Sequence, residues 1–329
     1  MKDAFLNIKD LHVEYTSGGQ VVKAVNGVDI TLNKGETLGL VGETGAGKTT
    51  IAKAILRILP QPPAKIRSGE IWLEDQNLLA IPEKDMLKIR GGKIAMIFQD
   101  PMTALNPVFK VGDQIAENIM QHEKVSKKEA KARALELLTQ MGIPEPEKRI
   151  DQYPHEFSGG MRQRAVIALA MSCNPKVLLA DEPTTALDVT IQAQIFELMD
   201  MLKEKFNTAI MLITHDMGVV SELADDVLVM YMGNVIESGT AREVLKNPKH
   251  PYTKALMDSI PVLGLGKEQN LTPIRGSTPD PFNRPKGCQF CPRCDFATAK
   301  CEEEMPGEVL VEGSHKCRCF LYQEQEGGK

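Results

Sequence analysis

The sequence predicts an α/β protein with a mainly parallel sheet core, an antiparallel β subdomain, a helical subdomain and a small Cys-rich C-terminal tail. Apolar runs of five or six residues, typical of buried parallel strands, recur along the chain at 37–41, 176–180, 208–213 and 227–231. The helical pattern at 184–206 separates two of these runs. Beyond Pro248 the chain becomes rich in Pro and Gly and carries six of its seven cysteines.

The first 60 residues predict a β layer followed by a strand, loop and helix unit. Residues 5–32 contain short strand patterns broken by Gly18–Gly19, which indicates a hairpin turn. The run at 37–41 is followed by a Gly-rich turn and by a helical pattern at 50–59. A parallel strand feeding a helix through glycines is a common setting for a phosphate site.

A helical insertion is predicted at about 100–175. Residues 112–142 carry two successive amphipathic patterns, and Ser126 with Glu129 three residues later indicates a capping box. We therefore expect one large domain over 1–250 and a second region over 251–329, which agrees with roughly two domains for 329 residues.

Composition excludes several function classes. The net charge of −5 gives no electrostatic case for a nucleic-acid partner. The N-terminus carries charges where a secretory signal would be apolar, and no run of about 18 apolar residues occurs. We expect a cytosolic chain without a transmembrane segment, whose membrane role, if any, is exercised through partners.

Residues 42–49, Gly-Glu-Thr-Gly-Ala-Gly-Lys-Thr, match the phosphate-loop pattern G-x-x-x-x-G-K-[ST] between a strand and a helix. Glycines allow backbone N–H groups to surround a phosphate, and a helix N-terminus adds positive partial charge. Lys48 would contact the β- and γ-phosphates, and Thr49 would ligate Mg²⁺. A tight turn used only for packing is the alternative. The predicted ATP-binding residues of this segment are Gly42, Thr44, Gly45, Ala46, Gly47, Lys48, Thr49 and Thr50.

Asp181 and Glu182 end the apolar run at 176–180. Asp181 is predicted to hold Mg²⁺, and Glu182 to face the γ-phosphate as general base. An isolated Asp-Glu pair would more often be a solvated turn. The preceding strand and the phosphate loop make it informative.

The segment 157–164, Phe-Ser-Gly-Gly-Met-Arg-Gln-Arg, resembles the signature of ATP-binding-cassette (ABC) ATPases, and other motifs of that family occur in order over residues 5–240. The resemblance implies a P-loop NTPase fold and catalytic roles for Lys48, Glu182 and His215. It implies that Gln99 joins the Mg²⁺ shell and that Tyr15 stacks on adenine. The further ATP-binding residues it implies are Ser158, Gly159, Gly160, Gln163 and Asp188.

The chain has two segments suited to binding an anionic group, the phosphate loop and the N–H groups of the helix after Ser158, but only one nucleotide-binding motif. This combination suggests that each nucleotide site is shared between two chains. In the family, the signature of one cassette closes over the nucleotide of another. The resemblance therefore implies a head-to-tail dimer with a second ABC ATPase subunit, either homologous or a second copy of this chain.

Residues 99–107 and 250–256, with the Cys-rich tail, are similar to the ATPase subunits of bacterial oligopeptide/dipeptide importers. This implies two membrane permeases, an extracytoplasmic peptide-binding protein and a peripheral position on the cytoplasmic face of the membrane. Nickel, glutathione or oligosaccharide uptake is an alternative. A non-transport ABC ATPase and a metal-sensing regulatory partner are further alternatives.

Six thiols within residues 288–319 favour a metal over disulfides in a cytosolic chain, with free thiols as the alternative. The family's four positions are Cys288, Cys294, Cys301 and Cys319, which in some members ligate a [4Fe-4S] cluster. Zn²⁺ also fits four thiolates and is the alternative to the iron–sulfur cluster, which we favour. Cys291 and Cys317 are possible further ligands. Cys173, in an apolar helical context, is expected to be a buried small residue.

Overall fold

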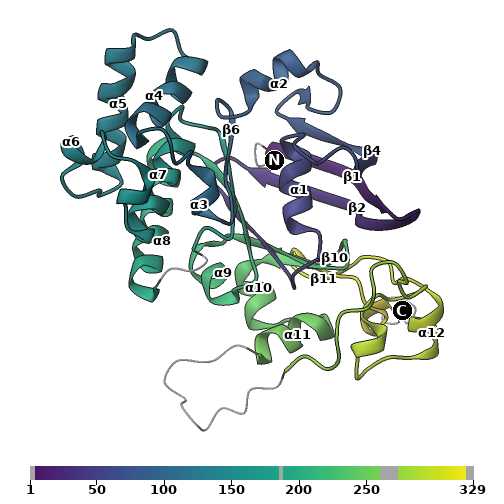
Figure 1. Cartoon of the computed structure of the whole chain (residues 1–329). Coiled ribbons are helices and arrows are strands. Elements are labelled where there is room, and N and C mark those ends of the chain that lie inside the picture. The colour runs from purple at the N-terminus through teal and green to yellow at the C-terminus, as the bar shows by residue number, and fades with distance from the viewer. Residues whose placement is uncertain (1–3, 185–187, 260–272, 324–329) are drawn as a thin grey trace. The chain divides into compact units, whose positions relative to one another are not determined.

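The computed structural model describes residues 4–184, 188–259 and 273–323 (Figure 1). These residues form two compact units, each built from several segments of the chain. Of the described residues, the first unit contains 4–7, 31–37, 72–184 and 188–213, and the second contains 8–30, 38–71, 214–259 and 273–323. Within the described ranges no helix has both the length and the apolar character needed to cross a bilayer.

The sheet of the first unit consists of β6 (Ile94–Ile97), β7 (Val177–Asp181) and β8 (Ala209–Thr214), all parallel, with β7 between the other two. Every residue of β7 and β8 is buried, which explains why these strands are continuous apolar runs in the sequence. The long helix α8 (Val189–Phe206) connects them, and the predicted parallel core is confirmed.

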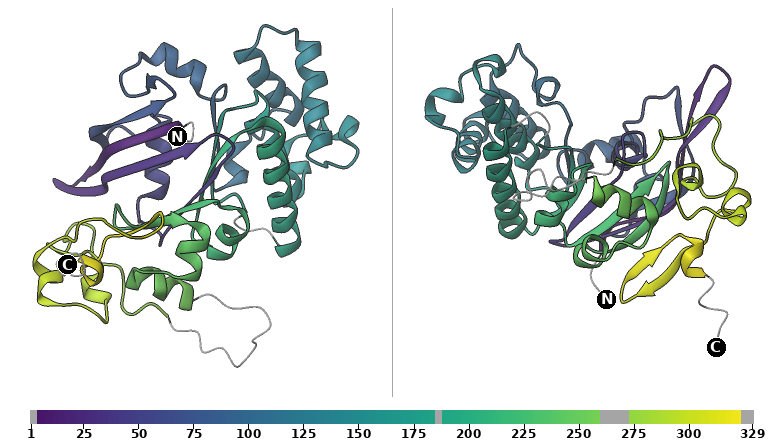
Figure 2. Two further views of the ribbon diagram at one scale, coloured as in Figure 1. Left: turned by 180° about the vertical axis from the view of Figure 1, so that it is seen from behind. Right: turned by 90° about the horizontal axis from the view of Figure 1, so that it is seen from below.

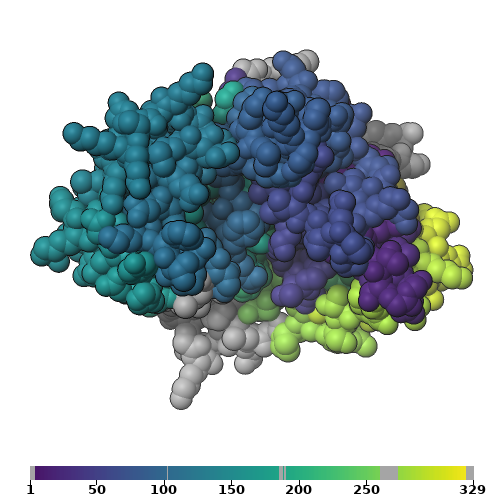
Figure 3. Space-filling model, turned by 45° about the horizontal axis from the view of Figure 1, so that its top comes forward, coloured from purple at the N-terminus to yellow at the C-terminus, as the bar shows by residue number. Residues whose placement is uncertain are grey.

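The predicted helical insertion is present in the first unit, and its side chains pack into one continuous mass (Figure 3, blue to teal). Ser126 and Glu129 form the expected capping box at the start of α5. The insertion consists of α3 (Pro101–Ala104), α4 (Val111–His122), α5 (Lys127–Gln140), α6 (Pro146–Arg149), a 3-10 turn (Pro154–Glu156) and α7 (Gly159–Met171). The unit also holds β5 (Gln76–Asn77) and α2 (Glu83–Ile89).

The predicted β layer consists of β1 (Ala4–Ser17), β2 (Gln20–Asn33) and β4 (Ala64–Leu73), with β1 in the middle. Gly18 and Gly19, both at positive φ, form the turn between β1 and β2, as the sequence predicts. Next along the chain come β3 (Thr37–Val41) and α1 (Lys48–Ile55).

In the second unit β3 is parallel to β9 (Asp226–Tyr231), which pairs antiparallel with β10 (Asn234–Thr240). The tail adds a hairpin to this sheet, because β12 (His315–Cys317) pairs with β10 and β11 (Val309–Glu312) pairs with β12 (Figure 2, yellow). The sequence did not predict these two strands, because each is only three or four residues long.

Besides α1, the described part of the second unit contains further short helices and 3-10 turns. They are α9 (Met217–Leu223), α10 (Ala241–Lys246), α11 (Pro251–Asp258), η3 (a 3-10 turn, Cys291–Arg293), α12 (Ala299–Glu303) and α13 (Phe320–Gln323). Tyr231, Tyr252 and Phe290 pack in one core, and Cys288 and Cys294 lie against it. The tail therefore shares a hydrophobic core with the strands around the phosphate loop.

Candidate functional site

The phosphate loop, residues 42–49, connects the buried end of β3 to the start of α1 in the second unit. Gly42 and Gly47 both have positive φ. A Cβ atom would lie 2.2 Å from the carbonyl oxygen of Met230 at Gly42, and 2.3 Å from that of Ala24 at Gly47. No other residue fits these two positions, so the motif glycines are required by the backbone.

The interior of the loop is lined by Lys48, whose side chain is buried in the described structure. Its ammonium group donates hydrogen bonds to the carbonyl oxygens of Gly42 at 2.5 Å and Glu43 at 3.1 Å. Thr44 and Gly45 are exposed at the tip. Because α1 begins at Lys48, its first N–H groups are directed toward the loop. This arrangement can surround an anionic group with backbone donors and one cation.

Glu43 is a loop residue that the sequence analysis missed. Its carboxylate accepts two hydrogen bonds from the guanidinium group of Arg293, at 2.6 and 3.0 Å, and its N–H donates to the hydroxyl of Tyr252 at 2.8 Å. No sequence signal pointed to this contact, because Glu43 occupies a variable position of the motif and Arg293 follows it by 250 residues.

The acidic strand end belongs to the first unit, at the carboxyl end of β7. Asp181 is 3% exposed, and Glu182 follows it in the left-handed region at φ 47°. The Glu182 N–H donates to the Ile213 carbonyl at 2.8 Å, and its carboxylate accepts a hydrogen bond from the Gln99 amide at 2.7 Å. The structure thus joins two predicted site residues, Gln99 and Glu182, that are 83 positions apart.

Ser158 is the N-cap of α7, and its hydroxyl accepts the Met161 N–H at 3.3 Å. Ser158 and Gly159 are exposed at the start of this helix, as the expected anion-binding role requires. Gly160 lies one residue further along α7, where a Cβ atom would approach Ile191 to 3.1 Å.

Gln163 and Asp188 have local structural partners. The buried Gln163 amide donates to the Pro183 carbonyl at 2.5 Å, so this side chain supports the turn after Glu182, and direct ATP contact stays a prediction. Asp188 is the N-cap of α8 and accepts the Ile191 N–H at 3.0 Å. Ala186 and Leu187, which accompany Asp188 in the family motif, lie outside the described residues.

Tyr15 and His215 both belong to the second unit. Tyr15 is half-buried on β1. His215 is exposed just after β8, and the following Asp216 caps α9 by accepting the N–H groups of Gly218 and Val219. The exposed His215 ring lies between the end of β8 and the start of α9, where it is accessible to a ligand. Its contact with a γ-phosphate stays a prediction.

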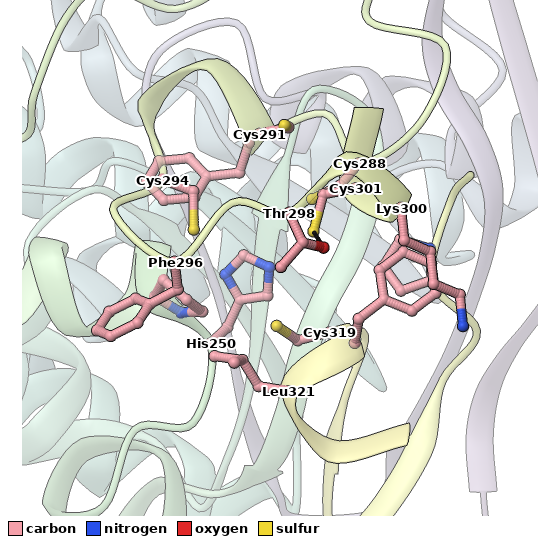
Figure 4. Close-up of a pocket in the computed structure, with 14 residues that line it drawn as sticks. His250, Cys288, Cys291, Cys294, Phe296, Thr298, Lys300, Cys301, Cys319 and Leu321 are labelled. Carbon is pink, nitrogen blue, oxygen red and sulfur yellow. Dashed lines mark hydrogen bonds between the residues drawn. The ribbon is translucent and has the colours of Figure 1, made fainter. Parts of the chain in front are cut away.

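Five cysteines line a single pocket of about 80 Å³ in the second unit, together with His250 and Phe290 (Figure 4). They are Cys288, Cys291, Cys294, Cys301 and Cys319. In Figure 4 the sulfur atoms of Cys294 and Cys319 point into the pocket, whereas that of Cys291 points away. Cys317 is buried on β12 and is not among the lining residues.

Burial raises the pKa of the Cys288 thiol to about 12, and it also raises the pKa values of Cys291, Cys294 and Cys319. These thiols therefore stay protonated near neutral pH unless a metal replaces the proton. Across the described ranges no group of three or more His, Cys, Asp or Glu side chains is arranged to hold a metal ion. The pocket supplies the right donor atoms but no finished coordination shell.

Cys173 is only half-buried, so the expectation of a core position is wrong. Its sulfur lies 3.7 Å from the Asn118 amide and 3.7 Å from the Asn118 carbonyl oxygen. The preceding residues Met171 and Ser172 are buried at this helix end.

Known protein families match both parts of the chain. The family described as "ABC transporter" matches residues 25–185, and "Oligopeptide/dipeptide transporter, C-terminal region" matches residues 236–301. The oligopeptide transport ATP-binding protein OppD of Bacillus subtilis is 51% identical over 96% of this chain and 88% of its own length. The chain belongs to the ATP-binding subunits of the ABC transporter family.

Relatives and solved structures agree with this membership. The dipeptide transport ATP-binding protein DppD of Bacillus subtilis is 48% identical over 97% of this chain and 95% of its own length. A dimeric, post-hydrolysis structure of the ATP-binding cassette MJ0796 bound to ADP and Pi is 26% identical, with a TM-score of 0.65 over 72% of this chain and 99% of that one. The P-loop ABC fold predicted from the motifs is confirmed.

Proposed function

We propose that this ABC subunit binds and hydrolyses Mg-ATP and thereby drives the uptake of dipeptides or oligopeptides through separate membrane permeases. The phosphate loop, with two obligatory glycines and a buried Lys48, is the observation that carries the ATP part. The relatives at about half identity over nearly the whole chain support the peptide part. They also support a peripheral position on the cytoplasmic face of the membrane.

Different residues of the chain would bind the phosphates, hold Mg²⁺ and act as general base. Lys48 would leave the Gly42 and Glu43 carbonyl oxygens to contact the β- and γ-phosphates. Thr49, Gln99 and Asp181 would hold Mg²⁺, which supplies charge neutralisation at the phosphates. Glu182 would accept a proton from the attacking water, with the Gln99 amide orienting its carboxylate and His215 near the γ-phosphate.

Partners follow from the same reasoning. The second ATPase subunit would be another copy of this chain or a homologous one. In a head-to-tail dimer, Ser158–Gly160 of each subunit would lie over the nucleotide of the other. The exposed N-cap at Ser158 supports this arrangement. The dimeric state named for the MJ0796 cassette supports this too. Two permeases and an extracytoplasmic peptide-binding protein would complete the importer.

Reconstitution tests the cargo. In proteoliposomes with the co-purified permeases and binding protein, we expect a dipeptide or oligopeptide to raise ATP hydrolysis and to accumulate inside. Nickel, glutathione and an oligosaccharide are the comparison cargoes. Stimulation by one of these and not by peptide would contradict peptide import, and hydrolysis that no cargo stimulates in the complete complex would favour the non-transport or regulatory alternatives.

We also propose that the cysteine pocket holds a metal centre, a [4Fe-4S] cluster or alternatively Zn²⁺, on Cys288, Cys294, Cys301 and Cys319. All four line the same pocket, and Cys291 is a possible substitute ligand. Protein purified without oxygen should be brown and contain about four irons and four sulfides per chain if the cluster is present. One zinc per chain without sulfide would identify the alternative. If neither iron nor zinc is found, the cysteines are free thiols and the proposed metal centre is wrong. Cys317→Ser, outside the lining, should keep the metal.

A further inference from the structure

We propose that Arg293 is a positioning residue of the phosphate loop, through which the cysteine segment, defined as residues 288–301, sets the affinity for ATP. This inference rests on ATP binding, which is part of the proposed function, but it depends neither on the cargo nor on the metal. It concerns the contact between Glu43 and Arg293.

The contact is specific in geometry. Both carboxylate oxygens of Glu43 accept a hydrogen bond from a different nitrogen of the Arg293 guanidinium, at 2.6 and 3.0 Å, which is the paired arrangement that arginine forms best. The Arg293 side chain is 4% exposed and that of Glu43 is 27% exposed, so the pair is largely shielded from water.

The backbone of Glu43 is fixed by a second residue of the C-terminal region. Its N–H donates to the hydroxyl of Tyr252, whose ring is buried against the rings of Tyr231 and Phe290. Tyr252 comes from the His-Pro-Tyr start of α11, where His250 is the N-cap and accepts the Tyr252 N–H. The tail region thus holds both the side chain and the main chain of one loop residue.

Glu43 is coupled to the functional lysine. The Lys48 ammonium group rests on the carbonyl oxygens of Gly42 and Glu43, so a shift of Glu43 changes the position from which Lys48 reaches a phosphate. The charge of Glu43 matters as well. A carboxylate inside a phosphate-binding loop repels the ligand, and Arg293 neutralises that carboxylate at close range.

Arg293 is in turn fixed by the cysteine segment. It ends η3, and the Cys294 N–H after it donates to the Cys291 carbonyl at 3.2 Å. Its Nε donates to the Arg275 carbonyl at 2.9 Å. Because Cys291 and Cys294 flank Arg293 and line the pocket, any rearrangement of these thiols moves the residue that holds the loop.

The test measures the Mg-ATP affinity of the full-length wild type and of its variants by titration with a fluorescent ATP analogue. Arg293→Gln should weaken binding about tenfold, a factor that corresponds to the loss of one shielded charged pair. Arg293→Lys, which keeps the charge and loses the paired geometry, should lie between this variant and the wild type. Lys316→Gln is the control, because its ion pair with Glu308 is exposed and lies in the same tail but outside the cysteine segment.

A second substitution separates positioning from damage to the fold. In the Arg293→Gln background the Glu43 carboxylate has lost its cationic partner and keeps the hydrogen bond from the Thr278 hydroxyl at 3.2 Å. Adding Glu43→Gln removes this charge and should restore affinity to within about threefold of the wild type, whereas a disrupted tail would not be restored. Arg293→Gln affinity within twofold of the wild type, or no recovery in the double variant, would overturn the inference. Failure of the wild type itself to bind Mg-ATP would instead overturn the proposed function.

Discussion

At the scale of single residues, side chains with predicted chemistry are held by partners that lie far away in the sequence. Glu182 adopts a left-handed conformation that is unusual for a non-glycine residue, and the Ile213 carbonyl and the Gln99 amide hold it there. Strain of this kind is common where a reactive group must point in one direction. The general-base role proposed for Glu182 is consistent with this geometry.

Glu182→Gln should retain ATP binding and lose turnover. The substituted amide cannot accept a proton but can still form a hydrogen bond with Gln99, so the turn after β7 keeps its conformation. We expect steady-state ATP hydrolysis to fall by at least about 100-fold, and ATP should trap a dimer visible by size-exclusion chromatography. Glu197→Gln, an exposed position on α8, is the control and should be unaffected. Near-normal hydrolysis by Glu182→Gln would refute the assignment.

At the scale of secondary-structure elements, α10 connects the cassette strands to the tail hairpin. Thr240 and Glu243 form a capping box at the start of α10. The Glu243 carboxylate also accepts the Ser314 hydroxyl at 2.7 Å and the Ser314 N–H at 3.1 Å, in the turn between β11 and β12. These hydrogen bonds, those of Ser314 foremost, lower the pKa of Glu243 to about 2.

Glu243→Gln should lower the free energy of unfolding at pH 7 by about 1 kcal/mol, because Gln at this position can keep the capping box but loses the charge that strengthens the hydrogen bonds from Ser314 and Thr240. Since the folded-state pKa lies below the unfolded value of 4.5, the stabilisation is complete above pH 4.5 and is lost as the pH falls toward 2. Urea unfolding of both proteins at pH 7, 4 and 3 measures this. A difference that stayed constant down to pH 3 would contradict the ionised cap, and Glu222→Gln, an exposed change on α9, should show none.

A second contact joins the hairpin to β10. The buried Glu237 carboxylate accepts hydrogen bonds from the N–H groups of Lys249 and His250 and lies 2.7 Å from the His315 ring nitrogen. Each of these partners would be left without a hydrogen bond if Glu237 were removed. The tail is therefore part of the packed structure of the second unit and not an appendage of it.

At the scale of the whole molecule, the sequence predicted the strands well and the tail poorly. Buried parallel strands such as β7 are apolar on both faces, so a single segment carries the signal. The hairpin β11–β12 is recognisable only by its pairing with β10, because its strands have only three or four residues each and no residue of β11 is buried.

The candidate sites likewise combine arrangements that a short segment specifies with contacts that form only in the folded chain. The phosphate loop, the acidic strand end and the helix N-cap at Ser158 are local arrangements, because each needs only a strand end or a helix start that a few adjacent residues specify. The sequence by itself therefore determined the fold class, the ATP chemistry and the family. Only the tertiary structure decided that Gln99 contacts Glu182 and that Arg293 and Tyr252 hold Glu43. These contacts join residues 83 to 250 positions apart, and no local pattern encodes which distant side chains packing brings together.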